Sequence, residues 1–173
     1  QLFYEWILHK YDINQLKRNG IMDVAGGSGD LSLLFMKNGI STTIIDPRMP
    51  NFLKKKDDDN TELCLKDRKQ INDYHNIIKD NKNISCNYVN EYFDDDILIR
   101  NDVINATFNK CALVIGLHCD EATEFIVNIC IKHNKPFAII PCCVFPKLYP
   151  KILNNKPVIT YNDFILYLKN KDL

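Results

Sequence analysis

The sequence predicts an open α/β fold in which a mostly parallel sheet carries helices on both faces. Three observations support this. A glycine-rich turn follows a short apolar run, a β-branched run ends at an aspartate, and apolar runs alternate with segments of helical periodicity. The runs that we interpret as strands lie at 21–24, 41–45, 84–89, 111–117 and 137–140.

Segments with apolar residues three and four positions apart lie before and between these runs. The first is interrupted near Asp12, and Gly39 provides a natural end for the second. Asp120 is predicted to cap the helix after the fourth strand. We predict a solvated loop for the charge block at 54–59 and no strand after Ile159. The predicted helices lie at 2–16, 30–39, 63–78, 120–130 and 161–168.

Length and composition predict a single domain over residues 1–173. Lys plus Arg and Asp plus Glu both number 22, so no global field attracts nucleic acid. The seven cysteines have no regular spacing, no signal peptide is evident, and no apolar run reaches membrane length. We therefore expect a cytoplasmic or nuclear protein without a membrane segment. Nothing in the sequence indicates an oligomeric state.

The glycine turn after the first run is the strongest candidate for a ligand site, because it brings bare backbone to the carboxyl edge of a strand. A dinucleotide fingerprint fits poorly, since Ser32 stands at the third glycine position. Asp23 closes the strand and suits the ammonium of an amino-acid-like cofactor. Asp46, twenty positions after Gly26, suits the hydroxyls of a ribose. The alternative is a purely structural turn with a capping aspartate.

Asp23 and the glycine turn resemble motif I of class I S-adenosylmethionine-dependent methyltransferases, with Ala25 where many members have the first glycine. The segments 116–123 and 141–147 resemble the branch with a Pro-Cys-Cys motif after the fifth strand, which includes tRNA ribose 2′-O-methyltransferases. The resemblance extends from Met22 to about Lys147. It implies a Rossmann-like methyltransferase domain, normally with two further strands, so we expect a chain truncated at its C-terminus.

The resemblance implies S-adenosyl-L-methionine as cofactor, S-adenosylhomocysteine as product and RNA, preferably tRNA, as methyl acceptor. Alternatives are methylation of a small molecule or protein, an inactive cofactor-binding partner subunit, and a nicotinamide-dependent dehydrogenase, which Ser32 disfavours. The predicted cofactor-binding residues are Asp23, Ala25, Gly26, Gly27, Gly29, Asp46, Asn90, Glu91 and Gly116.

The predicted catalytic residues are His118, Cys142 and Cys143, which follow the fourth and fifth strands. His118 is a candidate general base or part of a structural turn. For each cysteine the sequence leaves three roles open: a reactive thiolate, a zinc ligand or a small packing group. A zinc site including Cys119 is disfavoured because adjacent cysteines point in different directions, and we predict no metal. The basic, aromatic segment 145–156 is a weaker candidate for RNA contact.

Overall fold

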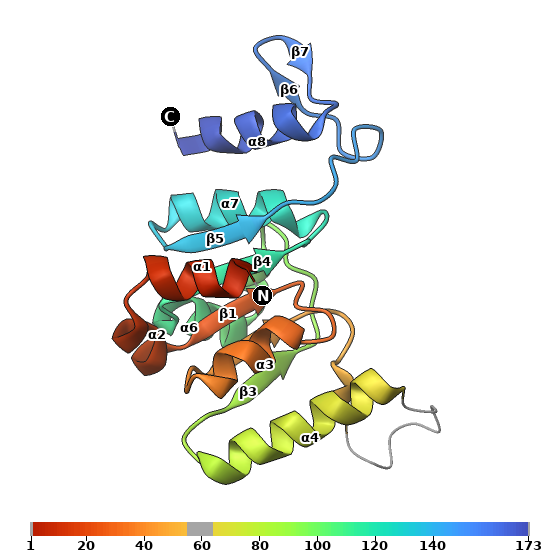
Figure 1. Ribbon diagram of the computed structural model, residues 1–173. Helices are drawn as coiled ribbons and strands as arrows, with labels where there is room; N and C mark the ends of the chain where they lie inside the picture. The colour runs from red at the N-terminus through yellow and green to blue at the C-terminus, as the bar shows by residue number, and fades with distance from the viewer. Residues whose placement is uncertain (1, 55–63, 173) are drawn as a thin grey trace.

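The computed structural model describes residues 2–54 and 64–172 and contains a five-stranded parallel sheet at its centre (Figure 1). The strand order is β3-β2-β1-β4-β5, and every neighbouring pair is parallel. The predicted α/β fold is therefore confirmed. The strands are β1 Ile21–Val24, β2 Thr42–Ile45, β3 Cys86–Val89, β4 Leu113–Leu117 and β5 Phe137–Ile140.

Helices cover both faces of the sheet, and alternate residues of a strand pack against opposite helix layers. Ile21 belongs to the core that contains residues of α1, α2 and α3, whereas Met22 and Val24 belong to the core formed with α5, α6 and α7. The first layer consists of α1 Leu2–Lys10, α2 Ile13–Asn19, α3 Asp30–Lys37 and α4 Leu65–Asp80. The second consists of α5 Ile97–Arg100, α6 Asp102–Lys110 and α7 Ala122–Lys132.

Two helix boundaries follow from local chemistry. Asp12 ends the first helical segment and caps α2, because its Oδ1 accepts a hydrogen bond from the Asn14 backbone N–H at 2.9 Å. Asp120 does not cap α7 as predicted. The residue has a positive φ of 43°, and α7 begins after Glu121 without a side-chain cap. The Asp120 side chain instead accepts a hydrogen bond from Cys142 Sγ at 2.9 Å.

The structure contains elements that the sequence did not predict. Helices α5 and α6 were missed, although Ile97, Ile104 and Phe108 are fully buried on them. The short η1 helix, Asn51–Leu53, precedes the segment 55–63, so most of the predicted charged loop and Leu63 lie outside the described residues. No described helix is long and apolar enough to cross a membrane.

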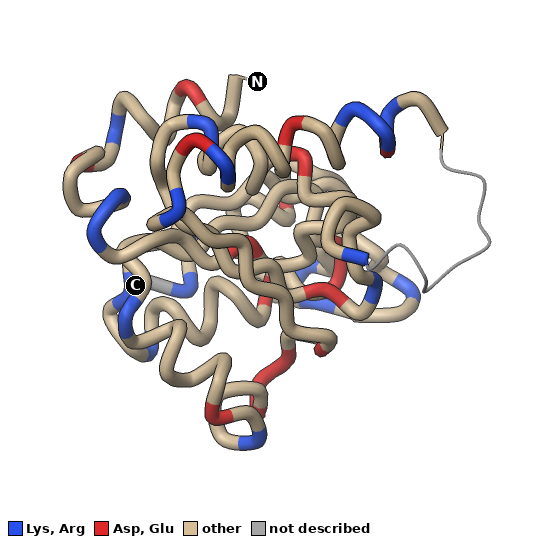
Figure 2. Tube along the Cα trace, turned by 90° about the horizontal axis from the view of Figure 1, so that it is seen from below, with Lys and Arg blue, Asp and Glu red and all other residues tan. Residues whose placement is uncertain are grey.

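The segment after β5 forms a small C-terminal unit against α7 (Figure 1). A hairpin of β6 Ile152–Leu153 and β7 Lys156–Pro157 leads to α8 Tyr161–Lys169 and η2 Asn170–Asp172. Glu124 of α7 anchors this unit, because it accepts a hydrogen bond from the Tyr167 hydroxyl at 2.5 Å and lies 2.8 Å from Lys171 Nζ. Charges of both signs are spread along the described part of the trace (Figure 2).

Candidate functional site

A pocket of about 570 Å³ lies at the carboxyl edge of the sheet. Ala25, Asp46 and His118, which follow β1, β2 and β4, line it together with the loop after β3. The strand order reverses at β1, because β2 and β3 lie on one side of this strand and β4 and β5 lie on the other. Ligands of open α/β sheets bind at such a topological switch point, so this pocket is the leading candidate site.

The glycine turn is shaped by both backbone conformation and packing. Gly27 and Gly29 have positive φ angles of 53° and 74°, and Ala25 shares this conformation at 53°. A Cβ on Gly29 would lie 2.6 Å from Cε1 of Phe52, and one on Gly26 would lie 3.0 Å from the Asp23 carboxylate. Packing therefore requires glycine at Gly26 and Gly29, whatever ligand the pocket holds, whereas at Gly27 glycine is favoured by the positive φ alone.

Asp46 connects the end of β2 to this turn. Its Oδ2 accepts a hydrogen bond from the Gly27 backbone N–H at 2.9 Å, and its Oδ1 accepts one from the Arg48 backbone N–H at 2.8 Å. The residue is only 3% exposed although it lines the pocket. A carboxylate has about four acceptor positions, so Asp46 keeps acceptor capacity beyond these two bonds.

Asp23 lies beneath the turn and does not line the pocket. The residue is 1% exposed, and its Oδ2 accepts a hydrogen bond from the Ser32 hydroxyl of α3 at 2.7 Å. Burial, with a smaller contribution from the charge of Asp46, raises the pKa of Asp23 to about 7. The prediction that Asp23 meets a cofactor ammonium therefore has no geometric support here, because the side chain faces α3.

The N-terminus of α3 already carries a negative charge. Asp30, its first residue, accepts hydrogen bonds from Ser28 Oγ at 2.8 Å, Lys66 Nζ at 2.5 Å and Gln70 Nε2 at 2.6 Å. Partial burial alone would raise the pKa of Asp30, but these hydrogen bonds outweigh it and the pKa is lowered. The carboxylate of the Asp30–Lys66 ion pair thus already lies at this helix start, which disfavours the phosphate site of a dinucleotide-binding turn.

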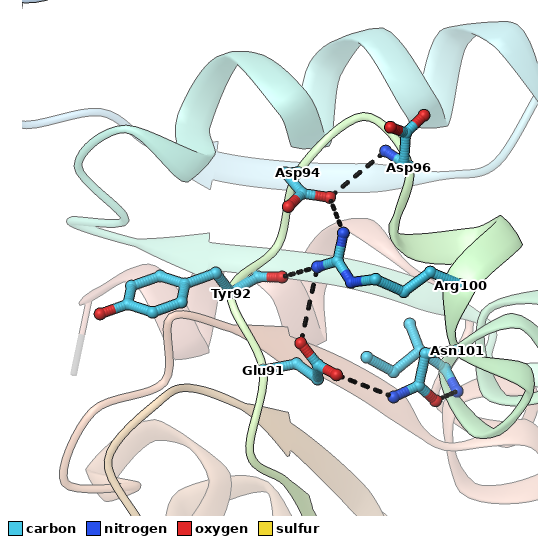
Figure 3. A network of polar contacts seen from close by, with 7 residues as sticks. Glu91, Tyr92, Asp94, Asp96, Arg100 and Asn101 are labelled. Atoms are coloured by element: carbon cyan, nitrogen blue, oxygen red, sulfur yellow. Dashed lines mark hydrogen bonds and ion pairs between the residues drawn. The ribbon is translucent and has the colours of Figure 1, made fainter.

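Arg100 organises the loop after β3 (Figure 3). Its guanidinium donates to Asp94 Oδ1 at 2.8 Å and to the Tyr92 carbonyl at 3.2 Å, and it lies 3.5 Å from Glu91 Oε2. Asn101 also donates to Glu91, at 3.5 Å. The Tyr92 ring points away from this network and is 64% exposed. The network thus fixes the loop that forms one wall of the pocket.

The two predicted base-reading residues lie in different surroundings. Glu91 lines the pocket, but its carboxylate is engaged by Arg100 and Asn101. Asn90 is exposed and is not part of the pocket lining. Only Glu91 of this pair is therefore positioned near a ligand in the pocket.

The end of β4 supplies one wall of the pocket. His118 is exposed, has a positive φ of 57° and lines the pocket. Cys119 is buried, and its Sγ lies 3.3 Å from the Thr123 hydroxyl. A Cβ on Gly116 would lie 2.7 Å from Cys119 Sγ. Gly116, predicted to bind cofactor, is thus required for packing beneath Cys119.

Cys142 and Cys143 do not line the pocket, although they lie beside Asp120, which does. Cys142 Sγ donates a hydrogen bond to Asp120 Oδ1 at 2.9 Å. Burial, together with the neighbouring Asp120 and Cys143, raises the pKa of Cys142 to about 12. The metal-free thiol therefore stays protonated at neutral pH, opposite to the lowered pKa that a thiolate nucleophile needs.

Sequence reasoning missed several residues that shape the site. Arg100 lies in a segment for which no element was predicted, and Phe125 lies in the predicted helix at 120–130, to which no ligand contact was assigned. The acidity of the pocket was also missed, because its carboxylates come from distant segments. Among the described residues that line the pocket, the potential cations are Arg48 and His118. The acidic lining residues are Asp46, Glu91, Asp94, Asp120 and Glu121.

One lysine of the predicted RNA-contacting segment 145–156 is engaged in contacts within the protein. Lys151 lies 3.2 Å from Glu124 Oε2 and donates to the Tyr149 carbonyl at 3.1 Å. Its side chain is only 9% exposed and also lies over the Phe164 ring. Lys147 and Lys156 remain exposed.

No protein-family model matches the sequence, and no curated protein matches it significantly. Among solved structures, the chain is similar to the E. coli tRNA N6-threonylcarbamoyladenosine dehydratase. The complex with AMP has 14% identity and a TM-score of 0.48, covering 79% of this chain and 56% of that one. The complex with ATP has 13% identity and a TM-score of 0.47, covering 80% and 58%. The chain thus spans less than two thirds of these proteins, and the likeness concerns the fold.

These matches correct the assignment made from sequence motifs. The similar structures are of a dehydratase solved with AMP and with ATP, not of a methyltransferase. The predicted family, the methyl-transfer activity and the S-adenosylmethionine cofactor were therefore wrong. An acidic residue followed by a glycine turn is shared by nucleotide-binding α/β folds of different chemistry, so the motif indicates the fold and does not identify the reaction.

Proposed function

We propose that the pocket at the carboxyl edge of the sheet binds a ribonucleoside, with Asp46 accepting hydrogen bonds from the ribose hydroxyls. The observation that carries this proposal is the position of the Asp46 carboxylate, which ends β2 beside the glycine turn and lines the pocket at the topological switch point. An acidic residue about twenty positions beyond the turn is the ribose-binding element of this architecture. The acceptor positions left free on Asp46 match hydroxyl donors.

The electrostatics favour a ligand without several phosphates. Five carboxylates line the pocket among the described residues, against one arginine and one histidine. Arg100 pairs with two of them, Glu91 and Asp94, which leaves Asp46, Asp120 and Glu121. Phe93 and Phe125 supply apolar surface that suits a planar base. A nucleoside, or a nucleotide whose phosphates are neutralised by a divalent cation, therefore fits better than a free triphosphate or a dinucleotide.

The test is calorimetric titration of the purified chain with adenosine, guanosine, cytidine and uridine, followed by AMP and ATP with and without Mg²⁺. We expect at least one nucleoside to bind, and its 2′-deoxy analogue to bind about tenfold more weakly, because one hydrogen bond to a charged acceptor is lost. Free ATP should bind more weakly than the nucleoside. Failure of all these ligands to bind would overturn the proposal, as would equal affinity for the ribo and deoxy forms.

Two variants separate ligand contact from turn structure. Asp46→Asn should weaken nucleoside binding by about tenfold or more, since an amide offers fewer acceptor positions than a carboxylate. Asp30→Asn removes another acidic side chain beside the same glycine turn but outside the pocket lining, and should leave nucleoside binding unchanged. Equal losses in both variants would show that the turn, and not the ribose contact, governs affinity.

We also infer a reducing, intracellular location, which is supported by seven cysteines that are all free thiols. An RNA partner is less well supported than a small nucleoside, because Lys151 is paired with Glu124. Titration of the chain with unmodified tRNA tests it. Binding tighter than that of every nucleoside would favour RNA as the ligand.

A further inference from the structure

Three potential metal ligands from separate segments meet beside the pocket. They are the Asp120 carboxylate, in the turn between β4 and α7, and the thiols of Cys142 and Cys143, directly after β5. One ligand atom from each residue lies within 4.8 Å of the other two. In a tetrahedral zinc site two thiolates at about 2.3 Å from the ion lie about 3.8 Å apart. The three ligand atoms would therefore move together by up to about 1 Å to bind a single ion.

The sheet holds these segments together. β4 and β5 are parallel neighbours, with Leu117 opposite Ile140, so their carboxyl ends emerge side by side. The His118 backbone N–H donates to the Ile140 carbonyl at 3.0 Å, immediately before both groups of ligands. This framework brings Asp120 within 2.9 Å of Cys142 across 22 positions of sequence.

We propose that Asp120, Cys142 and Cys143 bind a soft divalent metal ion, with Zn²⁺ as the best match. Two thiols and one carboxylate form a donor set that suits zinc, whereas Mg²⁺ and Ca²⁺ prefer oxygen ligands alone. On binding, each thiol transfers its proton to solvent as its Sγ–metal bond forms, and the carboxylate binds in its ionised form. This proposal does not depend on the nucleoside proposal.

The site would be open rather than purely structural. Three protein ligands leave a fourth tetrahedral position for water or for a ligand, which is the pattern of catalytic zinc sites. Asp120 and Cys143 are exposed and Cys142 is partly exposed, so an ion can reach all three. Because Asp120 also lines the pocket, a bound cation would offset part of the negative charge there.

The test is titration of the chelator-treated, reduced full chain with Co²⁺, followed by competition with Zn²⁺. We expect one Co²⁺ per chain, with a thiolate-to-cobalt charge-transfer band that Zn²⁺ abolishes. Cys142→Ser and Cys143→Ser should each lose most of this band. Asp120→Asn should weaken the affinity by more than about tenfold while retaining a thiolate band.

Cys64→Ser is the matched control. Cys64 is also exposed but stands at the start of α4, where serine is a good N-cap, so this variant should bind cobalt like the wild type. Circular dichroism and the urea midpoint of each variant exclude misfolding as the cause of a loss. Absence of the charge-transfer band from the folded wild type would overturn the proposal, and so would a band that persists unchanged in both cysteine variants.

Discussion

The Asp46 carboxylate accepts a hydrogen bond from the Gly27 backbone N–H at 2.9 Å, so the end of β2 supports the turn that follows β1. A second bond, from the Arg48 N–H, makes the same side chain a bridge between two loops at the edge of the pocket. A residue expected to serve a ligand therefore also has a structural role. Its substitution must be assessed through stability as well as binding.

Asp46→Ala should destabilise the protein. It leaves two backbone N–H groups without their present acceptor, and an unsatisfied buried donor costs about 1–3 kcal/mol. The measurement is urea unfolding of wild type and variant in the absence of any ligand. Asp46→Asn keeps one acceptor oxygen, so its free energy of unfolding should lie between those of the wild type and Asp46→Ala. An Asp46→Ala variant as stable as the wild type would show that water replaces both bonds.

Asp23 should make the free energy of unfolding decrease as pH rises from about 4 to about 7. Its pKa is raised from 3.8 in the unfolded reference to about 7 in the folded chain, because burial disfavours the charged form. Below this window the carboxyl is protonated in both states. Within it the unfolded chain releases a proton that the folded chain retains. The loss of stability is complete above the folded pKa.

Asp23→Asn should remove this contribution, so the variant gains stability relative to the wild type as pH rises, on the order of a few kcal/mol. Urea unfolding at several pH values measures it. Ser32→Ala removes the hydrogen bond that opposes the raised pKa and should extend the window to higher pH. The neighbouring Asp46, Cys86 and Cys119 are retained in both variants. Parallel stability curves for wild type and Asp23→Asn would contradict the assignment.

Gly116→Ala should destabilise the protein by about 1–3 kcal/mol, the usual cost of overpacking. The new Cβ would lie 2.7 Å from Cys119 Sγ and 3.0 Å from Cδ1 of Ile126. A double-mutant cycle with Cys119→Ala tests the cause, since removing the sulfur relieves the closer contact. The double variant should lose less stability than the sum of the single variants. If the losses of stability in the two single variants simply add, the contact with Cys119 Sγ is not the cause of the strain.

Arg100→Ala should loosen the loop after β3. Hydrogen exchange of residues 91–96 should become faster, because the donors to Asp94 and to the Tyr92 carbonyl are removed. Arg100→Lys is the matched control and should restore only part of the protection, since a lysine cannot reproduce the forked geometry. Unchanged exchange in Arg100→Ala would show that packing of Phe93 alone fixes the loop.

The sequence by itself determined most of the fold, because its main signals are local. Apolar runs ended by turn residues predicted the five strands. The glycine turn and Asp46 indicated the edge of the sheet at which the pocket lies. The helical segment at 97–110 was missed although Ile104 and Phe108 lie four positions apart, because Asn101 divides it into two short helices and caps both. The reaction class was wrongly assigned because a turn motif is common to several chemistries.

Only the tertiary structure decided what the individual side chains contact. Asp23 is buried where Ser32 of α3 contacts it, and Arg100, the last residue of α5, reaches back to Asp94 in the loop after β3. Asp120 meets Cys142 because two parallel strands end side by side. These contacts join residues that are separated along the chain, and their burial and charge depend on elements whose packing no local pattern encodes.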